Sequence, residues 1–84
     1  MEARLKKLNT VESLVLKRRW ILGEIKRFET KYGMSSSEFI EKWKRGLIPE
    51  PDDPEVHGDF MVWQGLIEEL NHVEKRLEKI ISER

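Results

Sequence analysis

The sequence contains no cysteine, which excludes disulfide bonds, a thiolate nucleophile and a cysteine-ligated zinc site. It has no run of eighteen consecutive apolar residues, so no segment qualifies as a membrane-spanning helix. With 84 residues the chain is predicted to be one domain, residues 1–84, and a domain of this size buries only about 60% of its unfolded surface. The lack of cysteine and of an apolar, signal-like run at residues 1–8 predicts a cytoplasmic protein.

Neither sign of charge is in excess, since 16 basic and 16 acidic residues give a net charge of zero. The charges are nevertheless segregated. Residues 1–46 carry twelve Lys or Arg and six Glu, a net of +6, whereas residues 47–84 carry four Lys or Arg and ten acids, a net of −6. One interpretation is that the two halves, or two copies, pack antiparallel. The other is that the acidic half binds a basic partner.

Apolar residues recur at alternating steps of three and four between residues 11 and 32, which predicts a long helix over residues 5–32. Thr10 offers an alternative start, because its hydroxyl can cap a helix beginning at the next residue. Gly33 is expected just beyond the end, since glycine adopts the left-handed conformation at low cost. The stripe consists of Val11, Leu14, Arg18, Ile21, Ile25, Phe28 and Tyr32.

A short second helix is predicted over residues 36–45. Ser35 and Glu38 match the capping box that begins many helices, and Gly46 can end this one. Residues 47–53 form an acidic connector, because their two prolines prevent a regular helix.

A third helix is predicted over residues 54–82. Asp53 can cap it, and Pro54 suits its first position. Asp59 is an alternative start, since a glycine precedes it. The apolar stripe of this helix consists of Val56, Trp63, Leu66, Leu70, Val73, Leu77 and Ile80.

These elements predict an all-α fold in which the two long helices form an antiparallel hairpin and the short helix crosses one end. Two hairpins are expected to dimerise into a four-helix bundle, so a homodimer is the predicted oligomer. The residues predicted to form the core or the dimer interface are Leu14, Ile21, Ile25, Phe28, Trp43, Trp63, Leu66, Leu70, Val73 and Leu77.

The middle of the first helix is apolar on more than one side. Leu16, Trp20 and Gly23 follow one another at steps of four and three on the side opposite the main stripe. A helix that is apolar on nearly all sides is buried on nearly all sides, which one partner helix cannot achieve. We therefore expect a second surface to cover Leu16 and Trp20. The alternatives are that the short helix folds over them, or that Trp20 is simply exposed.

Residues suited to catalysis or metal binding are few. His72 follows Glu69 by three positions, the spacing of di-iron bundles, but helical periodicity turns His72 away from the inward stripe. His57 stands near a helix start and is interpreted as a capping or loop residue. No Ser/His/Asp order and no Gly-rich phosphate loop is present. The sequence therefore predicts no enzymatic activity, no cofactor and no metal.

Two further functions remain as alternatives. Residues 32–35 (Tyr-Gly-Met-Ser) between two helices are similar to the turn of a helix-turn-helix. Against DNA binding, Glu29 stands where that motif has a small residue, and the first helix is longer than the motif uses. A purely structural self-assembling coiled coil is the other alternative, and membrane association is not expected. The basic residues that would contact phosphates are Lys42, Lys44 and Arg45.

Residues 31–35 (Lys-Tyr-Gly-Met-Ser) and the helix that follows them resemble a family of short archaeal and cyanobacterial helical proteins. The resemblance covers roughly residues 10–82 and continues through an acidic linker into an amphipathic C-terminal helix. Proteins of this family are described as uncharacterised or as antitoxins of type II toxin–antitoxin pairs. This chain departs from them in its longer Pro-containing connector. The other residues that carry the resemblance are Glu38, Phe39, Gly46, Asp59, Phe60 and Trp63.

The resemblance implies a protein that neutralises a toxin, often a ribonuclease-like one, by direct helical contact. In that role acidic side chains could mimic phosphates in a basic groove, and aromatic side chains could anchor the complex. The same acids have a simpler interpretation as solvated loop residues and helix caps. The residues predicted to bind a partner are Leu16, Trp20, Glu50, Asp52, Asp53, Asp59 and Phe60.

Overall fold

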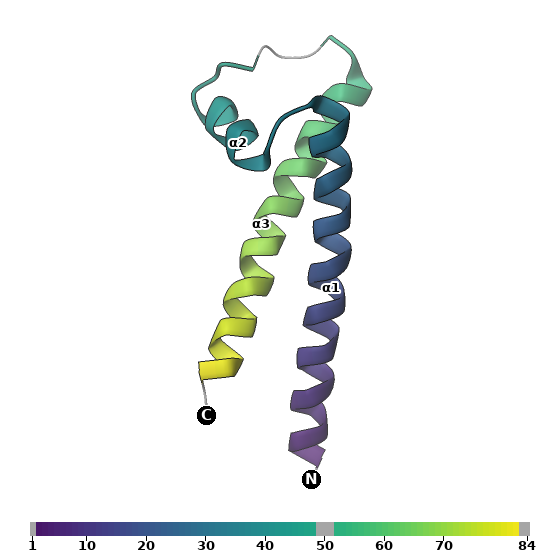
Figure 1. Ribbon diagram of the computed structural model, residues 1–84, viewed down its shortest axis with the longest axis vertical. Helices are drawn as coiled ribbons and strands as arrows, with labels where there is room; N and C mark the ends of the chain where they lie inside the picture. The colour runs from purple at the N-terminus through teal and green to yellow at the C-terminus, as the bar shows by residue number, and fades with distance from the viewer. Residues whose placement is uncertain (1, 49–51, 83–84) are drawn as a thin grey trace.

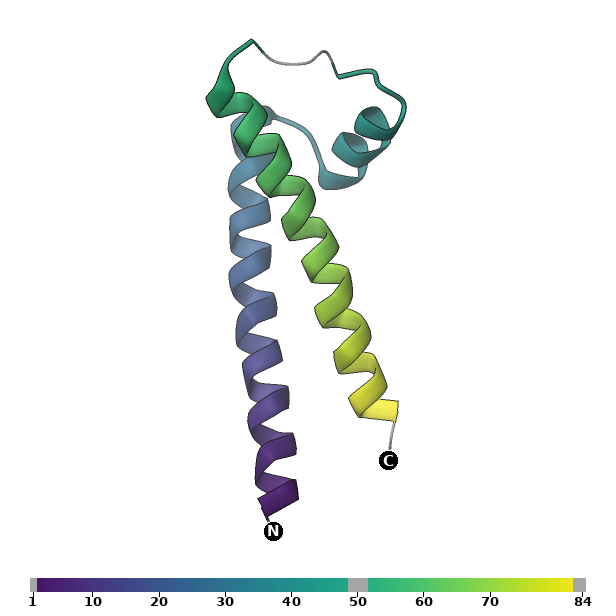
Figure 2. The same cartoon turned by 180° about the vertical axis from the view of Figure 1, so that it is seen from behind.

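The computed structural model describes the backbone of residues 2–48 and 52–82, and the side chains of residues 10–48 and 52–82. Within these ranges the chain forms α1 (Glu2–Tyr32), α2 (Ser36–Lys44) and α3 (Pro54–Ser82). The long helices α1 and α3 run side by side in opposite directions, and α2 lies beside one end of the hairpin (Figure 1, Figure 2). The predicted all-α fold with an antiparallel hairpin is therefore confirmed.

The observed helix bounds differ from the predicted ones by at most three residues. Helix α1 continues without a break through Thr10, so the alternative start at Val11 is wrong. Helix α3 begins at Pro54, so the alternative start at Asp59 is also wrong. The middle of the predicted connector, residues 49–51, lies outside the described residues.

Glycine ends both α1 and α2 as expected. Gly33 has φ 64°, in the left-handed region, and the backbone N–H of Met34 donates to the carbonyl of Glu29 over 3.2 Å. Gly46 repeats this conformation with φ 66°. These two turns satisfy carbonyls that the helix ends would leave without partners.

The start of α2 is held by two side chains. The hydroxyl of Ser35 accepts a hydrogen bond from the backbone N–H of Glu38 over 3.1 Å, as the capping box predicts. The carboxylate of Glu29 accepts a second one from the backbone N–H of Ser36 over 2.8 Å. Glu29 thus fixes the position of α2 relative to the end of α1.

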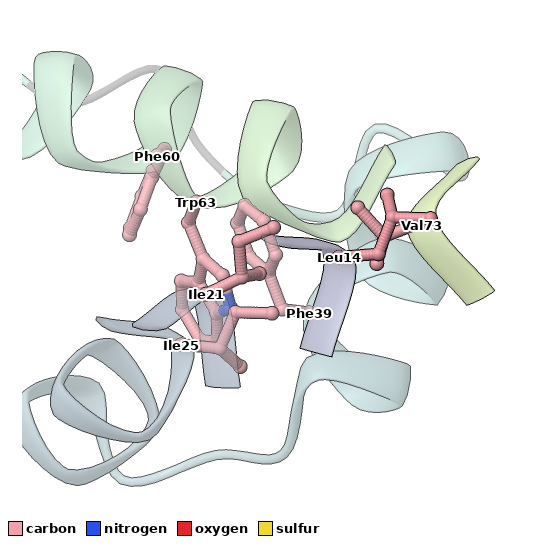
Figure 3. Close-up of a cluster of buried hydrophobic side chains, with 7 residues drawn as sticks. All are labelled: Leu14, Ile21, Ile25, Phe39, Phe60, Trp63 and Val73. Atoms are coloured by element: carbon pink, nitrogen blue, oxygen red, sulfur yellow. The ribbon is translucent and has the colours of Figure 1, made fainter. Parts of the chain in front are cut away.

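The core lies between α1 and α3 and beneath α2 (Figure 3). The ten predicted core residues all lie in this cluster or pack against it. The heptad pattern identified the nine that lie on α1 and α3, and Trp43 comes from α2. Five of these ten are only partly buried, namely Phe28, Trp43, Leu66, Leu70 and Leu77. The buried residues are Leu14, Ile21, Ile25, Phe39, Phe60, Trp63 and Val73.

Helix α2 is attached to the hairpin by aromatic contacts. The rings of Phe39 and Trp63 stack in parallel with their centroids 4.0 Å apart. The indole Nε1–H of Trp63 also donates to the hydroxyl of Ser36 over 2.9 Å. Phe60 lies 5.3 Å from Phe39, centroid to centroid, and extends the cluster. These contacts place α2 over Trp63. The described part of the hairpin farther from Trp63 is not covered by α2.

Candidate functional site

A groove of about 690 Å³ runs between α1 and α3. Its apolar members are Trp20 and Phe28 from α1, and Val62 and Leu66 from α3. In the described part of the chain its lining comes from these two helices alone, with no contribution from α2. The charged and polar residues around it are Glu24, Lys26, Arg27, Thr30, Lys31, Glu55 and Asp59.

Trp20 is the most conspicuous side chain of this groove because 60% of its surface is exposed. Leu16, one helical turn before it, is 55% exposed. The alternative in which the short helix folds over these residues is therefore wrong for this chain, since α2 packs on Trp63 instead. The two remaining interpretations both fit these exposures: a surface from outside this chain covers Leu16 and Trp20, or Trp20 is simply exposed.

Two hydrogen bonds converge on Oδ2 of Asp59. Lys31 Nζ donates to it over 2.6 Å, and the hydroxyl of Tyr32 donates to it over 2.6 Å. The bond from Lys31, followed by the bond from Tyr32, holds the pKa of Asp59 below its usual range. The same bond to Asp59 raises the pKa of Lys31, while burial raises the pKa of Tyr32.

Asp59 thus links α3 to the end of α1 within one chain. The prediction that its carboxylate serves a basic partner stays a prediction, and the carboxylate already has two partners within the chain. The prediction of Phe60 as an anchor for a partner is corrected, because Phe60 is only 6% exposed and packs among the core aromatics. Phe60 is buried although it lies outside the predicted apolar stripe of α3, because Phe39 of α2 packs against it.

The other acidic residues predicted to bind a partner are Glu50, Asp52 and Asp53. Asp52 and Asp53 are exposed, and the carboxylate of Asp53 accepts a hydrogen bond from the backbone N–H of Glu55 over 2.9 Å. Asp53 therefore caps α3, as its position predicts. Glu50 lies outside the described residues.

We expect Asp59→Asn to lower the free energy of unfolding at pH 7 by about 1 kcal/mol, because the charge-assisted bonds from Lys31 and Tyr32 are lost. The pKa of Asp59 is lower in the native than in the unfolded chain. The stabilisation is therefore complete above the unfolded pKa of about 4, and it disappears as the pH falls through the native pKa. Urea denaturation of both proteins from pH 7 to pH 2 measures this difference.

The control for this prediction is Glu68→Gln, which neutralises an exposed carboxylate on the same helix. We expect that change to alter the free energy of unfolding by less than about 0.5 kcal/mol. A gap between Asp59→Asn and the parent protein that stays constant down to pH 2 would contradict the assignment of the effect to ionised Asp59.

The basic residues of α2 are exposed but partly paired. Lys42 Nζ lies 3.4 Å from the carboxylate of Glu38, and the guanidinium of Arg45 lies 3.4 Å from that of Glu41. Lys44 is exposed as well. These intrahelical pairs reduce the net positive charge that α2 presents, and DNA binding stays an untested alternative.

Neither histidine takes part in a cluster of metal ligands. His57 and His72 are exposed, and His72 Nδ1 lies 4.0 Å from a carboxylate oxygen of Glu69. The other carboxylate oxygen of Glu69 contacts Lys17 Nζ at 2.5 Å, and that bond lowers the pKa of Glu69. Among the described side chains no three His, Asp or Glu residues are placed to hold a metal ion.

Val62 is a groove residue that heptad reasoning missed. It is 54% exposed and lies outside the apolar stripe of α3. A signal for it exists in the sequence, because Val62 precedes Leu66 by four positions and the two therefore share one flank of the helix. Only the approach of α1 shows that this flank borders a groove.

Comparison with known proteins gives no match to any family model, curated protein or solved structure. None of the helices in the described ranges combines the length and the apolar character that a membrane span requires. The functional argument therefore depends on the groove and on the side chains around it.

Proposed function

We propose that this chain is a non-enzymatic protein-interaction module that binds an α-helical surface through the groove between α1 and α3. The observation that carries the proposal is Trp20, whose indole is 60% exposed beside an apolar groove that α2 leaves uncovered. Tryptophan is strongly enriched among the residues that dominate binding energies, because it contributes a large apolar area together with one hydrogen-bond donor.

Self-association into a dimeric four-helix bundle belongs to the same proposal. A hairpin of this size has a small core, and its long helices retain exposed apolar side chains on both flanks. Covering the groove with two more helices would bury Trp20, Leu16 and Val62. The removal of this apolar surface from water favours dimerisation of the hairpin.

Neutralisation of a toxin is the narrower form of this proposal. The groove, rather than the acidic connector, is then the main contact, since Asp59 and Phe60 are engaged within the chain. Asp52 and the other exposed acids near the start of α3 can still steer a basic partner toward the hairpin.

A photo-crosslinking amino acid tests the proposal in the cell of origin. We expect Val62→p-benzoylphenylalanine to form a specific adduct, with either a second copy or another defined protein, because Val62 borders the groove. Met61 provides the matched control, since it is 50% exposed on the same helix but does not line the groove. Equal labelling from both positions, or none from Val62, would overturn the proposal.

Titration of the purified protein with duplex DNA at low salt distinguishes DNA binding from the proposed protein-interaction function. We expect no binding that falls steeply with salt concentration, because Lys42 and Arg45 are already paired with carboxylates. Salt-dependent binding that is lost in Lys42→Ala/Lys44→Ala/Arg45→Ala would favour the DNA-binding function instead.

A further inference from the structure

The two sides of the groove carry opposite charges. The cations Lys17, Arg27 and Lys31 stand along the α1 side, where Glu24 is the exception and pairs with Arg27 at 2.8 Å. The α3 side carries carboxylates: Glu55 and Asp59 line the groove, and Glu69 pairs with Lys17 further along α3. The hairpin therefore presents a basic edge and an acidic edge on either side of the apolar residues. The pairs Lys17–Glu69 and Lys31–Asp59 bridge the two edges and remain partly exposed.

Ion pairs between α1 and α3 show which residues of the two helices lie at the same level along the helix axes, called their height below. Lys17 contacts Glu69 near the middle of the molecule. Trp20 follows Lys17 by three positions and Leu66 precedes Glu69 by three, so Trp20 and Leu66 stand about one turn further along at a common height. Val62 lies one more turn along α3 and lines the same groove.

Two copies can face each other across this groove with two-fold symmetry in two ways. An axis perpendicular to the helices places α1 against α1 and α3 against α3, which brings like-charged edges together. An axis parallel to the helices places α1 of each copy against α3 of the other, which brings a basic edge to an acidic edge twice. These charges already pair within each copy but remain partly exposed, so the pairs of the two copies attract each other across the parallel axis and repel each other across the perpendicular one.

We propose that the occupant of the groove is a second copy of this chain, related by a two-fold axis parallel to the helices. Trp20 of each copy then inserts into the groove of the other, beside Val62 and Leu66. A parallel axis preserves height, so the exposed indole of one copy meets the exposed Val62 region of the second. The net charge of zero leaves no long-range repulsion between copies.

This inference rests on the proposed function, because it uses the same groove and names its occupant. It makes the groove a composite site, which is complete only when the second copy supplies Trp20. It also leaves α2 on the outside of the assembly, since α2 contributes no lining to the groove in the described part of the chain.

Sedimentation equilibrium of the full chain and of matched variants tests the contact. We expect a dimer for the parent protein, and a dissociation constant raised about tenfold or more in Val62→Asp, because a carboxylate would be buried at the interface. Met61→Asp is the control, with an exposed apolar residue on the same helix changed in the same way, and should dimerise like the parent. Trp20→Ser is the second groove variant, and circular dichroism verifies that each variant keeps its helices.

The distance between two spin labels, measured by pulsed electron paramagnetic resonance, tests the direction of the two-fold axis. The chain has no cysteine, so Ser82→Cys gives a single attachment site near the end of α3. A parallel axis brings both labels to the same end of the dimer, at a separation on the order of 10–30 Å including the label arms. A perpendicular axis through the groove places them at opposite ends, on the order of 50 Å apart.

The outcomes separate this inference from the proposed function. A dimer that persists unchanged in Trp20→Ser and Val62→Asp, or labels at opposite ends, overturns the inference and leaves the interaction module standing. A chain that stays monomeric at high concentration, but crosslinks another protein through Val62, also overturns the inference alone. Absence of both self-association and crosslinking overturns the two together.

Discussion

Trp63→Ala is expected to lower the free energy of unfolding by about 3–5 kcal/mol, the largest effect of any single substitution proposed for this chain. Trp63 has no exposed surface and stacks on Phe39 at 4.0 Å. Its ring also lies 5.9 Å from that of Phe28, and its Nε1–H is donated to Ser36. Alanine would remove the side chain that joins all three helices, and the cavity would be too large for the neighbours to fill.

Urea denaturation followed by far-ultraviolet circular dichroism measures this change, at one protein concentration for all variants because dimerisation would add to stability. Trp63→Phe is the informative control, since it keeps an aromatic ring against Phe39 but loses the bond to Ser36. We expect it to cost clearly less than Trp63→Ala. A loss below about 1 kcal/mol for Trp63→Ala would mean that the stack with Phe39 is not formed in solution.

Ile21→Ala is expected to lower the free energy of unfolding by about 2–5 kcal/mol. Ile21 is completely buried at the contact of α1 with α3, and it has the fixed side-chain geometry of a β-branched residue. Removing its methyl and methylene groups leaves a void between two packed helices. The surrounding side chains relax only partly around the smaller residue, so the cavity adds to the lost burial.

Leu22→Ala is the matched control, because Leu22 is the next residue along α1 and is 37% exposed. We expect its effect to be less than half that of Ile21→Ala, as less apolar surface returns to water. Thermal unfolding of the two variants and the parent protein at equal concentration provides the comparison. Equal losses from positions 21 and 22 would show that the α1–α3 seam does not lie where the structure places it.

The helices and their ends were predictable from the sequence because they depend on neighbours within a few positions. Ser35 and Glu38 cap α2, and Gly33 ends α1 in the left-handed conformation. The seam between α1 and α3 was predictable for a similar reason, since a heptad stripe reports which side of a long helix is buried. Residues in that stripe, such as Ile21 and Val73, are in the core.

What the sequence by itself determined is therefore the set of helices, their caps and the stripes along which the hairpin closes. Only the tertiary structure decided that Phe60 is buried, that Asp59 bonds to Lys31 and Tyr32, and that Val62 shares a groove with Trp20. These features join residues 21 or more positions apart, such as Phe39 with Phe60 and Trp20 with Val62, and they depend on how α2 and α3 sit against α1. Local periodicity reports the direction in which a side chain points, but only the packing of the elements determines what it meets there.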